Sequence, residues 1–276
     1  MTRAPSIEWV MVQLTDCHVV ERDRLAMDLV DTASFLRDAI ESTNELDPAA
    51  DLVVISGDLV DDGRPAQYDH LAEMVGRIDA PLLLMPGNHD SPDTLRTTIP
   101  AADRLPENAV ERDGPFLDVM IDGPVRVIAL DSSRGPDPSG RLEPSQLSWL
   151  DEQLGDEPER PTVVLLHHPP FATGIVHMDQ MGLDTTSSAG LAEVIGRHQQ
   201  VERICCGHLH RTISRRFAGT VAATAPSVAH SVAWDLTGQP AAASLEPPAI
   251  TVLLWGPELG LVAHQRAVGS YEVLRA

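Results

Sequence analysis

Short runs of apolar residues recur along the chain, and each is followed at once by polar residues. In Leu52-Val53-Val54-Ile55, four consecutive aliphatic residues predict a buried strand, and Gly57-Asp58 follows its end. The same pattern predicts strands over 7–14, 81–85, 162–166 and 201–206. Segments with apolar residues near helical spacing alternate with these runs and predict helices over 26–46, 65–78, 142–154 and 187–197.

The alternation of strands and helices predicts an α/β fold in which helices cover a sheet. Asp122-Gly123-Pro124 separates apolar runs at 116–121 and 125–130, which predicts a hairpin and therefore a mixed sheet. Two further hairpins are expected, over 212–224 and 250–265. No internal repeat or clean linker divides the chain, so a single domain over 1–276 is expected.

Two segments show no clear period. Residues 171–186 predict a long irregular loop, and loops of that length in a compact domain are usually functional or mobile. Residues 226–248, which are rich in Ala, Pro and Ser, predict an arm, loop or cap segment rather than core.

The charge balance limits the class of partner. Forty-one acidic residues against twenty basic ones give a formal net charge of −21. A chain this acidic is repelled by polyanions, so we expect neither a long nucleic acid nor an anionic membrane as partner.

The chain carries few signs of an oxidising or membrane compartment. Its cysteines, Cys17, Cys205 and Cys206, form no C-x-x-C pair, and free thiols fit a reducing cytosol. Residues 1–8 lack the apolar run of a signal peptide, and no segment approaches the roughly 20 apolar residues of a membrane span. A cytoplasmic location is therefore expected.

Five of the predicted strands end in residues that can bind metal ions. These are Asp16 and His18, Asp58, Asn88 and His89, His167, and His208 and His210. Carboxylate, imidazole and amide oxygen together suit Zn, Mn or Fe(II). The set exceeds the needs of one ion, and a carboxylate that bridges two ions accounts for the surplus. Ligands of open α/β sheets lie at the carboxyl ends of strands, where these residues fall.

The spacing within the blocks adds geometric expectations. On an extended segment Asp16 and His18 point the same way and reach one ion. His208 and His210 obey the same rule, unless the backbone turns after Gly207 and sends them to different ions. Gly57 and Gly87, like Gly207, precede a candidate ligand, as expected where backbone approaches a metal closely.

The ordered blocks resemble those of the calcineurin-like metallophosphoesterases. The resemblance covers about 7–224 and rests on five blocks, Asp16-x-His18, Gly57-Asp58, Gly87-Asn88-His89-Asp90, His167 and Gly207-His208-x-His210. Three further stretches resemble the bacterial class III phosphodiesterases, which act on cyclic nucleotides and glycerophosphodiesters: Asp61-x-Gly63, His167-His168-Pro169-Pro170 and Cys206-Gly207-His208. Met178-Asp179 resembles the glycerophosphodiesterase branch.

The resemblance implies a four-layer αββα sandwich of two mixed sheets, with a binuclear metal site at the strand ends. One metal is implied to bind Asp16, His18, Asp58 and His210, and the other Asp58, Asn88, His167 and His208. The metals are Fe, Mn or Zn. Residues 226–276 match loosely, where some relatives carry a cap or dimerisation element, so a homodimer or larger homo-oligomer is an expectation.

The implied reaction is hydrolysis of a small phosphodiester by in-line attack of a metal-bound hydroxide. Asp58 and Asn88 take part through the metals, and His89, which is not a ligand in the pattern, contacts the phosphoryl oxygen or the leaving group. A phosphomonoesterase or protein phosphatase would use the same ligands. A scaffold that has lost catalysis is the alternative of another class, against which the intact ligand set argues.

Overall fold

The structure is a computed structural model that describes residues 6–100, 104–135, 137–272 and 274. The first five residues, which belong to the stretch predicted not to be a signal peptide, lie outside this range. Among the described residues, no helix has the length and apolar character needed to cross a membrane.

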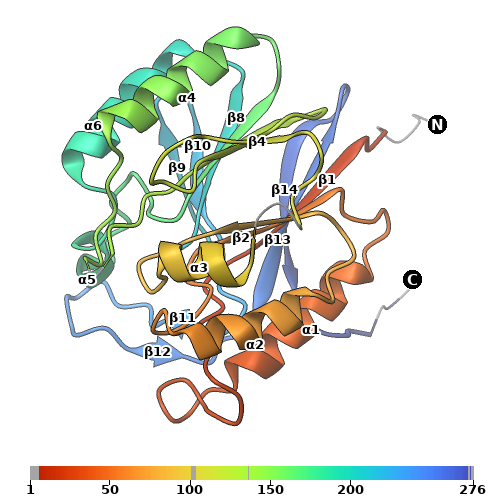
Figure 1. Cartoon of the computed structure of the whole chain (residues 1–276), viewed down its shortest axis with the longest axis vertical. Coiled ribbons are helices and arrows are strands. Elements are labelled where there is room, and N and C mark those ends of the chain that lie inside the picture. Colours follow the sequence, from red (N-terminus) through yellow and green to blue (C-terminus); the bar gives the residue numbers. More distant parts are fainter. Residues whose placement is uncertain (1–5, 101–103, 136, 273, 275–276) are drawn as a thin grey trace.

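Two mixed sheets form the centre of the molecule (Figure 1). One contains β1 (Trp9–Leu14), β2 (Leu52–Ser56), β3 (Leu82–Met85), β13 (Ala249–Gly256) and β14 (Gly260–Ala267), in the order β14-β13-β1-β2-β3. The other contains β4 (Ala109–Glu111), β5 (Val119–Ile121), β6 (Arg126–Leu130), β7 (Thr162–Leu166), β8 (Val201–Cys206), β9 (Ile213–Phe217) and β10 (Thr220–Thr224), in the order β4-β5-β6-β7-β8-β10-β9.

Helices cover the outer faces of both sheets (Figure 1). α1 (Thr32–Asn44), α2 (Pro65–Val75) and α3 (Pro92–Thr98) cover the five-stranded sheet, and α4 (Pro144–Asp156) and α6 (Thr185–Arg197) cover the seven-stranded one. The short helix α5 (Val176–Asp179) lies apart from these layers, where Met178 packs against Leu209. Leu36 of α1 and Leu71 of α2 pack in one apolar cluster with Val53 of β2. Leu150 of α4 and Leu191 of α6 share a second cluster with strands β6, β7 and β8.

A third apolar cluster lies between the sheets. It joins Met11 and Val54 of one sheet to Val127 and Leu165 of the other. Alternate residues of each strand therefore enter the inter-sheet layer or a helix-covered layer, as the pleat requires. These clusters confirm the αββα arrangement of two mixed sheets.

Strand direction brings the carboxyl ends together. β1, β2 and β3 are parallel neighbours, and so are β6, β7 and β8. The three predicted hairpins are confirmed as the antiparallel pairs β5–β6, β9–β10 and β13–β14.

The predicted helix over 26–46 is longer than the observed helix, α1. α1 begins at Thr32, and its N-cap Asp31 accepts a hydrogen bond from the Ser34 N–H. Before it, Met27 and Asp28 have positive φ of 52° and 57°, a left-handed backbone that cannot continue a right-handed helix. This segment instead forms a tight loop, which is closed by a hydrogen bond of 2.9 Å from the Ala26 N–H to the Val30 carbonyl oxygen.

The two unpatterned segments contain more structure than predicted. The loop 171–186 includes α5 and the first two residues of α6. In the segment 226–248, Val228 is fully buried within the core cluster of the five-stranded sheet, so its start belongs to the core. The rest is an arm with two short paired strands, β11 (Ser231–Val232) and β12 (Ala243–Ser244).

The C-terminal hairpin is an integral part of the five-stranded sheet. β13 pairs antiparallel with β1, from Trp9 opposite Trp255 to Gln13 opposite Thr251. Strands distant in sequence thus complete the sheet that carries the first candidate ligands. A cap or dimerisation role for 226–276 stays a prediction.

Candidate metal centre

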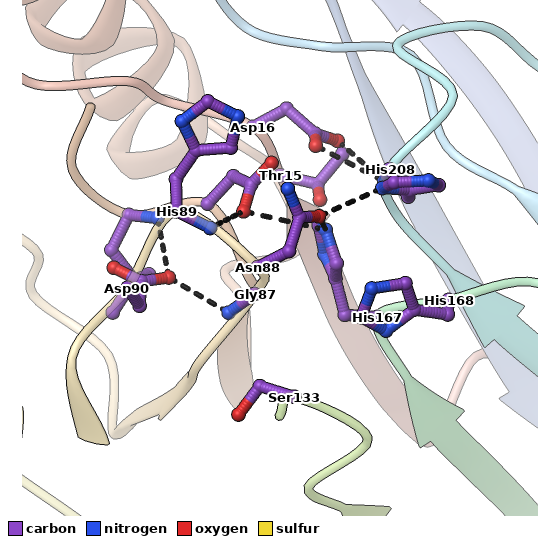
Figure 2. Close-up of polar contacts among 12 residues, drawn as sticks. Thr15, Asp16, Gly87, Asn88, His89, Asp90, Ser133, His167, His168 and His208 are labelled. Atoms are coloured by element: carbon purple, nitrogen blue, oxygen red, sulfur yellow. Dashed lines mark hydrogen bonds and ion pairs between the residues drawn. The ribbon is translucent and has the colours of Figure 1, made fainter. Parts of the chain in front are cut away.

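The polar residues that follow β1, β2, β3, β7 and β8 converge on one place (Figure 2). Asp16, His18, Asp58, His167, His208 and His210 are all buried. Asn88 is half-buried, and His89 is exposed at the rim. The structure therefore brings together every residue that the sequence singled out at the strand ends.

The backbone at these positions is left-handed rather than extended. Asp16, His18 and Asp58 have φ of 54°, 46° and 49°, and His208 and His210 have φ of 71° and 52°. The expectation that Asp16 and His18 lie on an extended segment was wrong, although both side chains reach the same place. Asp and His are enriched among residues that tolerate this conformation. Left-handed residues curl the chain tightly, so successive side chains gather at the strand end.

The first donor group consists of Asp16, His18, Asp58 and His210, whose ligand atoms all lie within 4.8 Å of one another. His18 Nε2 lies 3.2 Å from His210 Nε2, and His210 Nε2 lies 3.4 Å from Asp16 Oδ1. Four buried nitrogen and oxygen donors at this separation form a pocket of the size that one transition-metal ion occupies.

The second donor group centres on the side-chain oxygen of Asn88. This oxygen lies 3.2 Å from His167 Nε2 and 2.9 Å from His208 Nδ1 (Figure 2). Asp58 Oδ1 lies 3.4 Å from the same nitrogen of His167. Because His208 belongs to this group and His210 to the first, the backbone turn after Gly207 separates the two imidazoles.

Asp58 is shared between the two groups. Its Oδ1 faces His167 of the second group, whereas its Oδ2 lies 3.7 Å from His18 Nε2 of the first. The carboxylate thus has one oxygen for each group, the position that a bridging ligand occupies.

Backbone carbonyl groups set the orientation of the imidazoles. His167 Nδ1 lies 2.8 Å from the Ser56 oxygen, and His210 Nδ1 lies 2.7 Å from the His230 oxygen. A carbonyl only accepts, so these Nδ1 atoms donate, and in the neutral ring each Nε2 keeps a lone pair for its donor group. Such outer contacts commonly fix metal-binding histidines.

Close backbone approach explains the glycines before the ligands. A Cβ on Gly57 would collide with the His167 ring, and a Cβ on Gly87 would collide with the Asp58 carboxylate. At Gly207 the obstacle is the Thr15 hydroxyl oxygen. Close packing of protein atoms thus requires glycine at these three positions, whereas the predicted approach of backbone to a metal stays a prediction.

The electrostatics of the site fit bound cations. Burial raises the pKa of Asp58, but His167 and His18 outweigh it and hold that pKa well below the usual range. Burial lowers the pKa of His167, yet the carboxylate of Asp58 more than offsets it and raises the value to about 9. The buried carboxylate of Asp58 thus favours the protonated, positively charged form of His167. A divalent cation would supply the same compensating positive charge more completely. Among the described residues, buried His208 Nε2 has no hydrogen-bond partner.

Two acidic residues near Asp58 support it from outside the groups. The buried Asp90 carboxylate accepts hydrogen bonds from two backbone N–H groups, those of Leu59 at 3.0 Å and Gly87 at 2.8 Å. It also accepts one from the Tyr68 hydroxyl at 3.0 Å. Asp61 Oδ1 lies 3.3 Å from His18 Nδ1. Asp90 therefore holds the turn that carries Asp58, and Asp61 contacts a ligand candidate.

His89 occupies a distinct position. Its backbone N–H donates to Asp58 Oδ1 at 2.9 Å, and its ring lies edge-on to His18 at a centroid distance of 4.7 Å. Its Nδ1 lies 2.7 Å from the Asp61 carbonyl oxygen, so Nδ1 donates and Nε2 is left for a ligand.

Two contributions were missed at the sequence level. His230 of the arm, assigned no role from the sequence, lies 4.7 Å from His210 and 5.3 Å from His18 between ring centroids. Ser132 follows β6 and contacts His168 Nδ1 at 2.9 Å. Ser132 could have been found from the sequence, because Asp131-Ser132-Ser133 follows a buried strand as the other blocks do. No pattern in the sequence pointed to His230.

His168 orients the site rather than joining a donor group. Its Nε2 lies 3.2 Å from the Pro138 carbonyl oxygen and donates to it, so Nδ1 accepts from the Ser132 hydroxyl. Its ring packs against His167 and His208 at centroid distances of 4.9 and 4.8 Å. Burial, followed by the neighbouring imidazoles, lowers its pKa well below the usual range and keeps it neutral.

A family comparison agrees with this geometry. The model of the calcineurin-like phosphoesterase family matches residues 11–212, which span all five strand-end blocks. The chain belongs to the calcineurin-like phosphoesterase family. The calcineurin-like fold thus accounts for the placement of the donor groups at the strand ends.

Relatives of this calcineurin-like phosphoesterase include named phosphodiesterases. The chain is 34% identical over 265 residues to the probable glycerophosphodiester phosphodiesterase of Arcobacter nitrofigilis, covering 95% of this chain and 94% of the relative. It is 30% identical over 217 residues to the 3',5'-cyclic adenosine monophosphate phosphodiesterase of Escherichia coli K12, covering 79% and 75%. A solved dimetal phosphatase from Danio rerio shares the fold, with a TM-score of 0.70 at 15% identity over 96% and 98% of the two chains.

Proposed function

We propose that this chain is a metal-dependent phosphodiesterase that hydrolyses small phosphodiesters with two divalent cations. The observation that carries the proposal is the position of Asp58, whose two carboxylate oxygens face separate donor groups, at 3.4 Å from His167 and 3.7 Å from His18. The first group would hold one cation through Asp16, His18, Asp58 and His210. The second would hold the other through Asp58, Asn88, His167 and His208.

The protein residues hold the charge that such a site needs. When bound, divalent cations attract the phosphoryl oxygens, lower the pKa of water beside them and neutralise charge in the transition state. Asp16 and Asp58 balance that positive charge, and Asp58 reduces the repulsion between the two ions. Imidazole, carboxylate and amide donors suit Fe, Mn and Zn.

His89 is proposed to act on the leaving group. It lines a cavity of about 580 Å³ beside Asn88, and its Nε2 is left unbonded by the contact of Nδ1 with Asp61. As an imidazolium, Nε2–H donates a proton to the departing alkoxide. The carbonyl of Asp61 holds the ring in the orientation that this transfer requires.

Small diesters are the proposed substrates. The relatives of Arcobacter nitrofigilis and Escherichia coli are named for a glycerophosphodiester and a cyclic nucleotide, which are small. The net charge of −21 opposes a long polyanion at the same site. The three cysteines of the chain are buried and free, which supports a reducing cytoplasm as its location.

Two other functions compete with this proposal. A phosphomonoesterase or protein phosphatase would use the same donor groups, and a non-catalytic scaffold would share the fold. The intact donor groups and the placement of His89 favour catalysis, because a scaffold has no need for buried carboxylates poised beside imidazoles.

The test is turnover with defined metals. We expect the purified protein loaded with Mn(II) to hydrolyse bis(p-nitrophenyl) phosphate faster than p-nitrophenyl phosphate. Absence of metal-dependent turnover of both would contradict an enzyme, and faster cleavage of the monoester would favour a phosphatase. A panel of cyclic nucleotides and glycerophosphodiesters would then identify the natural substrate.

A further inference from the structure

Two cavities open onto the donor groups. The first, here called the Trp234 cavity, has a volume of about 680 Å³ and reaches the first donor group through His210. The second, here called the His89 cavity, has a volume of about 580 Å³ and reaches the second group through Asn88 and His89. A phosphodiester carries two organic substituents, so each cavity has room for one of them.

The Trp234 cavity combines apolar and polar side chains, and the charges in its wall are paired. Its walls include Ile175, Trp234 and Leu236. The Arg211 guanidinium, the cationic group in this wall, is paired with the Glu246 carboxylate and also donates to the Val232 carbonyl. No charge of Arg211 is therefore left for a ligand. Beneath the wall, Ile175 belongs to an apolar cluster with Met178 and Leu209, which joins α5 to the arm.

An aromatic surface is left open in this cavity. Trp234 is 73% exposed and Leu236 is 53% exposed. Exposed apolar side chains that line a cavity next to a reactive centre gain free energy when a ligand covers them. An indole ring offers a flat face on which a planar group stacks.

The His89 cavity offers no such surface. Its aromatic ring, Phe116, is covered by the guanidinium of Arg134 at 4.8 Å. Its other walls include Asp62, Ser91 and Ser133. This cavity therefore lacks an aromatic ring as open as Trp234, and it contains His89, the proposed proton donor.

We propose that the Trp234 cavity binds the retained substituent of the diester and selects an uncharged, planar group by stacking on Trp234. The leaving group then occupies the His89 cavity, within reach of His89. This inference rests on the proposed phosphodiesterase function and adds the orientation of the substrate. Trp234 is a specificity-determining residue in it, and Leu236 lines the same wall.

Two substrates with the same leaving group test the assignment. Bis(p-nitrophenyl) phosphate retains an aryl group, whereas methyl p-nitrophenyl phosphate retains a methyl group, and both release p-nitrophenolate. With full-length Mn(II)-loaded protein, we expect Trp234→Ala to lower kcat/KM roughly tenfold for the aryl diester and less than about twofold for the methyl diester. Trp234→Phe keeps a flat ring and should restore most of the loss.

Leu245→Ala is the matched control, because Leu245 is 68% exposed on the same arm but does not line the cavity. It should leave both substrates unchanged. Equal effects of Trp234→Ala on the two diesters, or none, would overturn the inference while wild-type turnover upholds the proposed function. A change in oligomeric mass with equal loss on both substrates would assign Trp234 to an interface and overturn it too. Lack of turnover by the wild-type protein would instead refute the function itself.

Discussion

Asp58 Oδ1 lies 3.4 Å from His167 Nε2, while the other oxygen of the same carboxylate is directed at the opposite donor group. In the proposed site, Asp58 would contribute a ligand to both cations, whereas His167 would contribute to one. The asymmetry makes the proposed ligand set testable by metal content alone, without any assay of turnover.

We expect Asp58→Ala to lower Mn(II) binding at both sites and His167→Ala to lower it mainly at one. Removing the shared carboxylate takes a ligand from each cation and leaves their repulsion unscreened. Bound manganese per chain, measured after equilibrium dialysis, should fall further in the first variant. His264→Ala, a change on exposed β14, should bind manganese as the wild type does. Equal losses confined to one site in both variants would contradict a bridging role for Asp58.

His89→Ala should lower kcat more for diesters with a poor leaving group than for diesters with a good one. An alkoxide needs a proton as it departs, whereas p-nitrophenolate is stable without one. We expect kcat to fall on the order of a hundredfold for an alkyl diester such as glycerophosphoethanolamine, and less than about tenfold for bis(p-nitrophenyl) phosphate. Metal content should be unchanged. Similar losses for both substrates would assign His89 to binding rather than proton donation.

Ser132→Ala should loosen the second donor group through His168. The substitution removes the hydroxyl at 2.9 Å from His168 Nδ1 and leaves a buried acceptor unpaired. Such a loss costs about 1–3 kcal/mol of stability, and outer contacts of metal ligands typically tune metal affinity 10–100-fold. Urea denaturation and Mn(II) titration measure the two effects. Ser270→Ala, at an exposed position, is the control. Unchanged metal affinity in Ser132→Ala would show that His168 does not position its neighbours.

The stability contribution of Asp118 should decline as pH rises. Burial raises the pKa of this carboxyl above 3.8, although the Asp131 N–H and the Gln146 amide donate to it. The folded state therefore holds the proton more tightly than the unfolded state. This contribution is complete below the unfolded pKa and is lost as pH rises through the folded pKa.

The measurement is the free energy of unfolding of the wild type minus that of Asp118→Asn, followed from pH 4 to pH 7. We expect the difference to fall over this range. Asp151 gives the opposite sign, because the hydrogen bond from His198 lowers its pKa and its contribution is lost as pH falls. The difference between the wild type and Asp151→Asn should therefore stay nearly level from pH 4 to pH 7 and fall as pH drops below about 4. A flat or rising profile for Asp118 would contradict the pKa shift.

A chain that ends before residue 249 should fail to fold. It lacks β13, which pairs with β1 from Trp9 to Gln13, and β14 with it. Loss of two strands from the five-stranded sheet exposes apolar residues of β1 such as Trp9 and Met11. Circular dichroism and thermal unfolding of the truncated chain measure this. A cooperative unfolding transition at the wild-type temperature would show that the hairpin is dispensable for folding. Because the truncated chain is expected not to fold, the oligomeric state is measured on the intact chain.

The sequence alone determined the alternation of elements and the identity of the strand-end residues. Runs such as Leu52 to Ile55 predicted buried strands because a short aliphatic run that ends at a glycine is typical of a strand covered on both faces. Local patterns of this kind depend on neighbours along the chain, so they can be recognised without knowledge of tertiary contacts. The order of the blocks, from Asp16 to His210, carried the family resemblance for the same reason.

Only the tertiary structure decided how those residues meet. The left-handed backbone at Asp16 and Asp58 and the contacts of Asp90 depend on loops that adjoin in space. The contact of His230 with His210 and the pairing of β13 with β1 were beyond sequence reasoning, because the partners are distant along the chain. Periodicity reports which face of an element is apolar, but it holds no information on which distant element covers that face.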